Sequence, residues 1–431
     1  PTRRAAADED GPLKVALIHT ADFGGGAERS VLSLHRALRE RGHQSTLYVG
    51  YKHTDEPGVV EIERVRALPG LVRATRWLEE RMGWQYLYAP GFRRLVRELP
   101  TDVDVVNIHT LWGAGGYADP GTLPELSRRF PLVLTMRESW LITGHCACPF
   151  ACERWKTGCG ECPDLTLLPS IRRDGTRFNW KRKARVLGET DAVITTVSDW
   201  LRGQAEQSPI LEGKEIVRVH NGIDLDVFRP GSTDEARREL GLPEDRLDRF
   251  IVLIAGQTLE GHRQGIAEDG PRALDRIDDP RLLVTPVGKS SDVVAGRLEV
   301  ETWPLEFQET PEAMARCYRA ADLTLVSSEY ESFGRIAAES QACGTPVVTV
   351  STGGLSEVVE DGVGGIVVPP RDAGALAGAV RRLMDAPEER ERMGRDGIEH
   401  ARRMFDRERI ADAYVEVYRR AIGTRSHEVA D

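Results

Sequence analysis

The sequence lacks long apolar runs, and no stretch reaches the roughly 18 residues that a membrane-spanning helix needs. The opening residues, PTRRAAADEDGP, also lack the apolar centre that characterises a secretory signal peptide. We therefore expect a soluble, cytoplasmic protein, and we interpret residues 1–10 as a disordered tail.

Positive charge is not in excess either. Lysine and arginine number 58 against 68 acidic residues, which gives a formal net charge of −10. Proteins that bind nucleic acid usually present a basic face, so we expect no nucleic-acid partner. Aromatic residues are few, at 6%, but 40% of the residues are hydrophobic, so the 431 residues can fill more than one core. Two domains of about 200 residues each are predicted.

Short apolar segments alternate with helix-like segments along the chain. One series starts at LKVALIHT and another at RFIVLIAGQ, and each is followed by a glycine-containing loop and a helical pattern. Buried strands that alternate with helices are typical of parallel sheets, so the pattern predicts the α/β class with two Rossmann-like halves. We place the domains at residues 11–229 and 249–405, joined by a charged, structured connector at 230–248, with a terminal helix and tail over 406–431.

The stretch SSEYESFGRIAAESQACGTPVV, residues 327–348, places Glu331 and Glu339 around an exposed-looking Phe-Gly pair. It follows a predicted strand and precedes a predicted helix, and parallel sheets bind ligands at this end of their strands. If the chain is helical from Ser332, the two glutamates lie about 12 Å apart. The paired acid/base carboxylates of glycoside hydrolases lie only roughly 5 to 9.5 Å apart. We therefore expect the two glutamates to bind different parts of one extended ligand.

The start of that predicted helix suits an anion. Backbone N–H groups there are unpaired and the helix dipole favours negative charge, so a phosphate or diphosphate fits. The predicted donors are the N–H groups of Ser332, Phe333, Gly334 and Arg335. A ligand with hydroxyls at both ends and a diphosphate between them is a nucleotide sugar.

Glu331-x7-Glu339, followed by QACGTPVVTVSTGGLSEVVEDGVGGIVVPPRD, resembles the signature of the retaining GT-B glycosyltransferases of family GT4. GGAERSV and HNGIDLDVF fit the same family, so the resemblance spans most of the chain. It implies the GT-B fold, in which two Rossmann-like domains with parallel sheets face a central cleft. The first would bind the acceptor, the second the nucleotide sugar, and the terminal helix would cross back to the first domain. It also implies retaining transfer from a nucleoside diphosphate sugar without a catalytic metal.

The resemblance assigns roles to individual residues. Glu339 would hold the ribose hydroxyls and Glu331 the hydroxyls of the donor sugar. His109, at the end of a predicted strand, would lie near the reacting sugar, where an imidazole that titrates near neutral pH could accept from a hydroxyl. Helix capping by the glutamates and a structural histidine remain the alternatives.

A glycine loop and several cations would face the diphosphate. Three consecutive glycines would let the first loop approach it closely, although a simple tight turn is the alternative: Gly24, Gly25 and Gly26. The family's Arg and Lys pair is incomplete, because Arg263 is present but Gln264 stands where a lysine is expected. Glutamine cannot supply the charge, so Lys289 or Arg335 would replace it. Without a replacement, the donor is unusual, transfer is slow or the chain is a silent relative.

Cysteines concentrate in the loop at residues 140–165. Four of them have spacings that suggest a structural zinc site, with disulfides or free thiols as the alternatives: Cys146, Cys152, Cys159 and Cys162. His145 and Cys148 are spare ligands. The loop resembles that of a GT4 subgroup in exopolysaccharide assembly, but here Arg137 and Glu138 replace its His and Asp.

Arginines interleave with apolar residues over 64–99, which indicates a solvated helical insertion or, at most, peripheral membrane contact. The sequence as a whole predicts a retaining glycosyltransferase in polysaccharide or natural-product biosynthesis. Its acceptor would be a sugar, a lipid-linked sugar or a small natural product, with oxygen or even sulfur as the attacking atom. The alternatives are a non-catalytic nucleotide-sugar-binding protein and a GT-B nucleotide-sugar epimerase.

Overall fold

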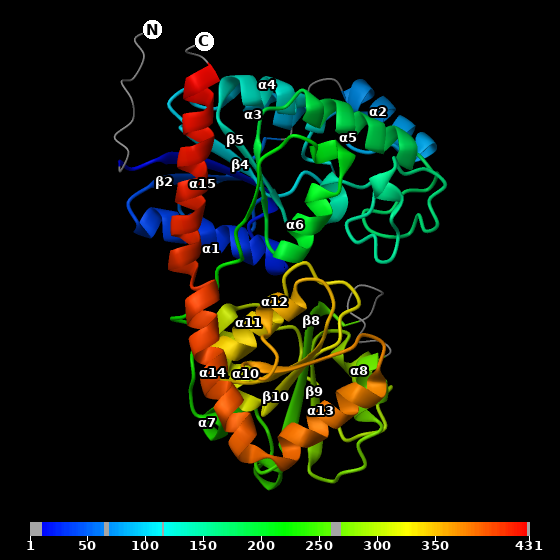
Figure 1. Cartoon of the computed structure of the whole chain (residues 1–431), viewed down its shortest axis with the longest axis vertical. Helices are drawn as coiled ribbons and strands as arrows, with labels where there is room; N and C mark the ends of the chain where they lie inside the picture. Colours follow the sequence, from blue (N-terminus) through cyan, green and yellow to red (C-terminus); the bar gives the residue numbers. More distant parts are fainter. Residues whose placement is uncertain (1–10, 64–68, 114–115, 260–268, 429–431) are drawn as a thin grey trace. The chain divides into compact units, whose positions relative to one another are not determined.

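The computed structural model describes residues 11–63, 69–113, 116–259 and 269–428 (Figure 1). The described chain divides into two compact units. Unit 1 comprises the residues up to Val219 and those from Glu408 onward, and unit 2 comprises His220–Arg407. Each unit contains one parallel sheet flanked by helices, which confirms the predicted α/β class with two Rossmann-like halves.

Within the described residues, the sheet of unit 1 has seven strands in the order β3-β2-β1-β4-β5-β6-β7. The order reverses between β1 and β4, and such a reversal is where open parallel sheets bind ligands. The central strands are buried on both faces, which explains their mostly apolar sequences, and their polar side chains Asn107 and Thr135 are hydrogen-bonded to each other. The bounds are β1 (Lys14–Ala21), β2 (Gln44–Tyr51), β3 (Val59–Glu61), β4 (Val105–Ile108), β5 (Leu132–Met136), β6 (Val193–Thr196) and β7 (Ile216–Arg218).

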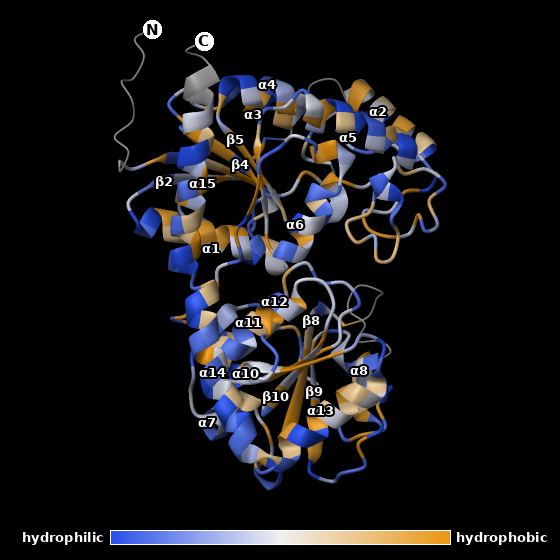
Figure 2. Cartoon of the chain, viewed as in Figure 1, coloured by the Kyte–Doolittle hydropathy of each residue, from blue (hydrophilic) through white to orange (hydrophobic). Residues whose placement is uncertain are grey.

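The helices of unit 1 carry both hydrophobic and hydrophilic residues, as the colouring in Figure 2 shows, and most of them bury part of their apolar side chains. Their bounds are α1 (Gly26–Glu40), α2 (Pro69–Met82), α3 (Pro90–Glu98), α4 (Leu123–Arg129), α5 (Thr176–Gly188), α6 (Asp199–Glu206) and α15 (Arg407–Glu428). Single 3-10 turns lie at Pro120–Thr122, Ser139–Leu141, Arg154–Lys156 and Pro209–Leu211.

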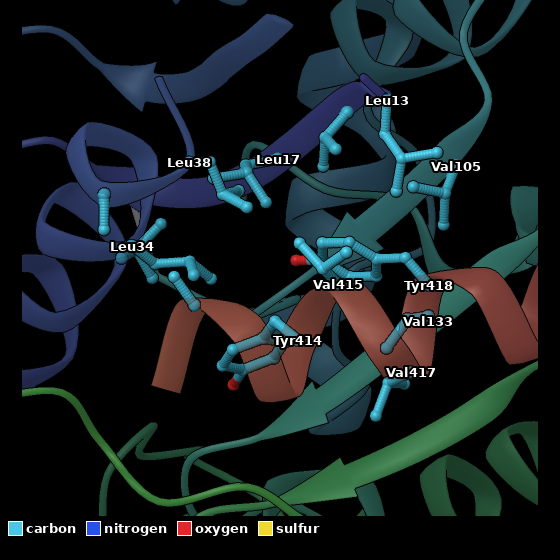
Figure 3. Close-up of a cluster of buried hydrophobic side chains, with 14 of the residues drawn as sticks. Leu13, Leu17, Leu34, Leu38, Val105, Val133, Tyr414, Val415, Val417 and Tyr418 are labelled. Atoms are coloured by element: carbon cyan, nitrogen blue, oxygen red, sulfur yellow. The ribbon is translucent and has the colours of Figure 1, made fainter. Parts of the chain in front are cut away.

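Helix α15 supplies part of the core of unit 1. Tyr414 and Tyr418 lie in one buried cluster with Leu34 and Leu38 of α1 and with residues of the sheet (Figure 3). The hydroxyl of Tyr418 donates to Oδ1 of Asn107 on β4 at 2.8 Å, so a polar contact also fixes the helix on the sheet. The C-terminal segment therefore completes a core that begins near the N-terminus.

The described strands of unit 2 form a five-stranded sheet in the order β12-β11-β10-β8-β9. Its strands are β8 (Phe250–Thr258), β9 (Leu282–Lys289), β10 (Leu323–Val326), β11 (Val347–Val350) and β12 (Gly365–Val368). Its helices are α7 (Thr233–Glu239), α8 (Asp269–Leu274), α9 (Ser291–Ala295), α10 (Pro311–Ala320), α11 (Arg335–Ala342), α12 (Leu355–Val358), α13 (Ala373–Asp385) and α14 (Pro387–Phe405), with a 3-10 turn at Glu244–Arg246.

The charged segment 230–248, expected to connect two domains, belongs to unit 2 in the structure. Its helix α7 is anchored by Arg237, which is only 5% exposed. The Arg237 guanidinium donates to the main-chain oxygen of Ala320 at 2.9 Å and to Asp322 at 2.7 Å. These contacts hold the segment against the end of α10 and the residue Asp322 beyond it, so its charge pattern does not mark a linker.

The arginine-rich segment 64–99 contains two helices, α2 and α3, in its described part. Several apolar side chains of α2 are exposed, among them Trp77, whose exposed fraction is 60%. None of the helices in the described ranges is both long and apolar enough to cross a bilayer.

Candidate functional site

Polar side chains gather at the carboxyl edge of the sheet in unit 1. His19 lies near the end of β1, His109 follows β4 directly, and Arg137 follows β5 directly. These strands are parallel neighbours, so their carboxyl ends meet at one edge. All three side chains are buried, with His19 and His109 each 1% exposed. The edge therefore carries buried polar groups at the reversal of strand order, where a ligand is expected.

Arg137 and His109 are joined by a hydrogen bond. Nη2 of Arg137 lies 2.9 Å from Nδ1 of His109, and the His19 ring stands edge-on to the His109 ring with centroids 6.4 Å apart. Burial, together with the charge of Arg137, holds the pKa of His109 well below its usual range. The same causes lower the pKa of His19 to about 3. Both imidazoles are neutral at pH 7, so the expectation that His109 titrates near neutral pH is wrong.

Glu138, the neighbour of Arg137, is engaged elsewhere. Its carboxylate accepts from Nε1 of Trp112 at 2.7 Å and from the backbone N–H of Trp140 at 2.5 Å. The Arg137–His109 contact was not predicted from the sequence. The sequence did show that both residues directly follow a predicted strand. Because parallel sheets bring the ends of their strands to one edge, this position could have indicated the contact.

The glycine loop joins β1 to α1. Gly24 has a φ of +146°, which disfavours any side chain there, and Gly25 precedes the first residue of α1, Gly26. The first turn of α1 also carries Glu28, whose carboxylate lies 3.9 Å from Nε2 of His19. The three glycines thus lie at a helix N-terminus beside the histidine cluster, with an acidic side chain that the sequence interpretation did not consider.

In unit 2, the segment after β10 contains the two glutamates. Helix α11 begins at Arg335, and Gly334 before it has a φ of +104°. The chain is not helical from Ser332, so the separation of 12 Å derived for a continuous helix does not apply. Phe333 is 3% exposed and contacts the rings of His220 and Phe405, so the exposed appearance of the Phe-Gly pair was also misleading.

Glu339 is buried on α11, with an exposed fraction of 2%. Its carboxylate accepts from the hydroxyl of Tyr318 at 2.9 Å and pairs with Nε of Arg335 at 2.6 Å. Arg335 also donates to the main-chain oxygen of Gly222 at 3.2 Å. Glu331 is half-buried in the loop, where its main-chain oxygen accepts from the N–H of Gly354 at 2.8 Å. The predicted diphosphate ligand Arg335 is therefore already paired with the predicted ribose ligand Glu339.

The remaining predicted cations lie apart from this segment in the sequence. Lys289 ends β9, and its ammonium group lies 5.7 Å from the ring centroid of Phe307. Strands β9 and β10 both pair in parallel with β8, so Lys289 lies at the same edge of the sheet as the loop that follows β10. Arg263 and Gln264 lie outside the described residues.

The cysteine-rich loop of unit 1 is held by separate polar contacts. Sγ of Cys159 accepts from the N–H of Gly144 at 3.2 Å, and Sγ of Cys162 lies 3.3 Å from Nε2 of His145. The buried ammonium group of Lys183 donates to the main-chain oxygens of Trp140 and Thr143, which anchors the start of the loop on α5. The four predicted zinc ligands and His145 help to line a small cavity of about 20 Å³.

These contacts do not form a metal centre. Among the described residues, no three histidine, cysteine or acidic side chains are placed to hold one ion, so the predicted structural zinc is not supported. All seven cysteines fall in the described part of the chain and are free thiols. Burial raises the pKa of Cys146 to about 12 and that of Cys159 to about 11. Zinc binds thiolates, whereas the thiols of Cys146 and Cys159 are protonated at pH 7, and the sulfurs of Cys159 and Cys162 contact separate partners.

Comparisons with known proteins place this fold. Residues 24–227 match the family model described as Glycosyltransferase Family 4, and residues 300–400 match Glycosyl transferases group 1. A D-inositol 3-phosphate glycosyltransferase of Mycobacterium bovis is 30% identical over 464 aligned positions, which cover 99% of this chain and 87% of that one.

Two solved structures are similar over nearly their whole lengths. Sucrose-phosphate synthase from Thermosynechococcus elongatus has a TM-score of 0.67 at 21% identity, with 96% of this chain and 100% of that one covered. Anabaena HepE, solved in complex with UDP-glucose, has a TM-score of 0.66 at 17% identity and the same coverage. Both likenesses concern the fold, which is GT-B. The family-model matches and the relative that spans 99% of the chain show that this protein belongs to glycosyltransferase family 4.

Proposed function

We propose that this chain transfers a sugar from a nucleoside diphosphate donor to a hydroxyl of an acceptor, with retention of the anomeric configuration and without a catalytic metal. The acceptor oxygen forms a bond to the anomeric carbon while the bond from that carbon to the diphosphate oxygen breaks. The acceptor's proton passes to the leaving diphosphate. The observation that carries the proposal is the pair Glu331 and Glu339 around the N-terminus of α11.

Unit 2 would bind the donor. The N-terminus of α11 follows β10 at the carboxyl edge of the sheet, and its N–H groups and dipole suit a diphosphate. Glu331 would accept from the donor sugar. Glu339 would accept from the ribose, and in doing so it would exchange its contact with Arg335 for two hydroxyl groups. The freed guanidinium and Lys289 would then supply the positive charge that stabilises the leaving group.

Unit 1 would contribute His109 and the glycines of the β1–α1 loop. The acceptor would be a sugar or a polyol. The name of the Mycobacterium bovis relative makes D-inositol 3-phosphate the first acceptor to test, and the complex of HepE makes UDP-glucose the first donor. The resemblance of the cysteine loop to exopolysaccharide-type enzymes adds saccharide acceptors to the panel.

One alternative is a protein with the same fold and donor site that binds a nucleotide sugar but does not catalyse its transfer. Gln264 stands where a lysine is expected, and a site with too little positive charge would bind a nucleotide sugar without turning it over. A GT-B epimerase is the other alternative, and it would convert the sugar nucleotide with no acceptor.

The test incubates the chain with UDP-, GDP- and dTDP-sugars, with and without a panel of sugar and polyol acceptors, while the released nucleoside diphosphate is measured. We expect release that depends on both one donor and one acceptor. Tight donor binding with no release from any pair would establish the non-catalytic alternative. A changed sugar nucleotide in the absence of acceptor would establish the epimerase.

A further inference from the structure

The contact between Arg137 and His109 has a chemical consequence. We propose that Arg137 is a positioning residue that fixes His109 as the neutral tautomer with its proton on Nε2, so that His109 donates a hydrogen bond to a substrate oxygen and does not act as a base. The inference rests on the proposed function in one respect, because it takes His109 to face the substrate.

The tautomer follows from donor chemistry. A guanidinium group has five N–H donors and no acceptor. Nη2 of Arg137 lies 2.9 Å from Nδ1 of His109, so Nδ1 must be the acceptor and carries no proton. A neutral imidazole holds one ring proton, which is therefore on Nε2.

The surroundings keep the ring neutral. Among the described residues, the titratable and charged groups that act on or contact His109 are His19 from β1, Arg137 after β5 and Tyr414 from α15, whose ring centroid lies 6.0 Å away, and none of these is negative. The carboxylate of Glu28 on α1 lies beside His19 instead, 3.9 Å from Nε2 of that ring. The nearby carboxylate of Glu138 accepts from Trp112 and Trp140. A protonated imidazole would therefore stand beside a guanidinium in a buried position, without a counter-ion.

The second ring nitrogen of His109, Nε2, determines which ligand groups can bind beside it. Nε2 of His109 is buried and has no hydrogen-bond partner among the described residues. A buried N–H without a partner is unfavourable, so this position calls for an acceptor. The fitting groups are oxygens: a sugar hydroxyl in its acceptor role, a ring oxygen or a phosphate oxygen. A substrate N–H or a cation would be rejected here, because two donors would meet.

The direct readout is the protonation of the ring nitrogens. The chain is labelled with ¹⁵N-histidine, and the His109 signals are identified by their loss in His109→Gln. In the native chain we expect Nδ1 to be unprotonated and Nε2 protonated, unchanged between about pH 5.5 and 8.5. Arg137→Met should shift the ring to a mixture of tautomers, whereas Arg137→Lys, which still donates, should preserve the native signals.

Arg93→Met is the matched control. It also removes an arginine of unit 1, but Arg93 pairs with Asp119, which keeps Arg182 as a second partner. The His109 signals should not change in this variant. A native spectrum with the proton on Nδ1, or titration of His109 within that pH range, would overturn the inference, and both are measured even if Arg137→Met fails to fold.

Kinetics separate positioning from a structural role. If Arg137 positions His109, Arg137→Met should lower kcat/KM by about tenfold or more, with the loss largely restored in Arg137→Lys. An equal loss in both variants with native tautomer signals would contradict the inference. The spectra require no turnover, so a chain that transfers no sugar would count against the proposed function and leave the tautomer result intact.

Discussion

His19 and His109 are buried and neutral in the folded chain, whereas in the unfolded chain each takes up a proton near pH 6.5. Their pKa values are lowered by folding, that of His19 to about 3. The folded state thus binds fewer protons below pH 6.5. Their contribution to stability is fully present above that pH and is lost as the pH falls below 6.5; for His19 the loss continues toward pH 3 at about 1.4 kcal/mol per pH unit.

His19→Gln should remove its share of this acid dependence. Denaturant unfolding followed by tryptophan fluorescence reports on unit 1, because among the tryptophans only Trp303 lies in unit 2 and the rest lie in described parts of unit 1. The free energy of unfolding should fall less steeply between pH 6.5 and 5 than in the native chain. His53→Gln, at an exposed position, is the control. Equal slopes for all three proteins would contradict the assignment.

Glu331 is expected to contact the donor sugar. Glu331→Gln keeps the shape but removes the charge, and a hydrogen bond to a charged group contributes about 1.5 to 3 kcal/mol. We therefore expect kcat to fall about 10- to 100-fold, while the midpoint of thermal unfolding stays the same. Glu329→Gln, an exposed change two residues earlier, should have the native rate. An unchanged rate in Glu331→Gln would remove this residue from the site.

At the scale of elements, the cysteine-rich loop makes a prediction of its own. Burial raises the pKa values of Cys146 and Cys159, so their thiols are protonated and unreactive at pH 8. In the native chain we expect Cys146 and Cys159 to react slowly with a thiol reagent. After unfolding without a reductant, all seven cysteines should react. Fewer than seven reactive thiols would reveal a disulfide. Release of zinc on unfolding would show that the loop binds this metal after all.

The strands were predictable because those buried on both faces have mostly apolar sequences, as in VVNI of β4 and LVLTM of β5. The start of α11 was placed too early, at Ser332, because the sequence does not show that Gly334 adopts a positive φ just before the first helical residue, Arg335. The contact of Arg137 with His109 could not be predicted, because the residues are 28 positions apart and only the strand order makes them neighbours. The burial of Phe333 depends on Phe405, which lies even farther away in the sequence.

The candidate functional residues were predicted from the family resemblance and not from the hydrophobic pattern. Periodicity located the loops at the carboxyl ends of the strands, but the family resemblance selected residues within them. That resemblance could not reveal the pairing of Arg335 with Glu339, which depends on their spacing of one helical turn in α11. The roles of these residues stay predictions until substrate is bound.

For the molecule as a whole, α15 is the element that joins distant parts of the sequence into one core. Tyr418 is fully buried against unit 1 and bonds Asn107. Tyr418→Ala would remove a large buried side chain and leave the Asn107 amide oxygen without this donor. We expect unit 1 to lose about 3 to 5 kcal/mol of stability. The exposed change Glu416→Ala on the same helix should cost less than about 0.5 kcal/mol, and equal losses would contradict the account.

The central claim is retaining transfer from a nucleoside diphosphate sugar. The most direct measurement follows one reaction by proton NMR, from the α-linked donor to the anomeric signal of the first product, while the released nucleoside diphosphate is quantified. We predict one α-linked product for each nucleoside diphosphate released, with no metal added and a chelator present. A β-linked first product, or turnover that stops with the chelator, would contradict the account.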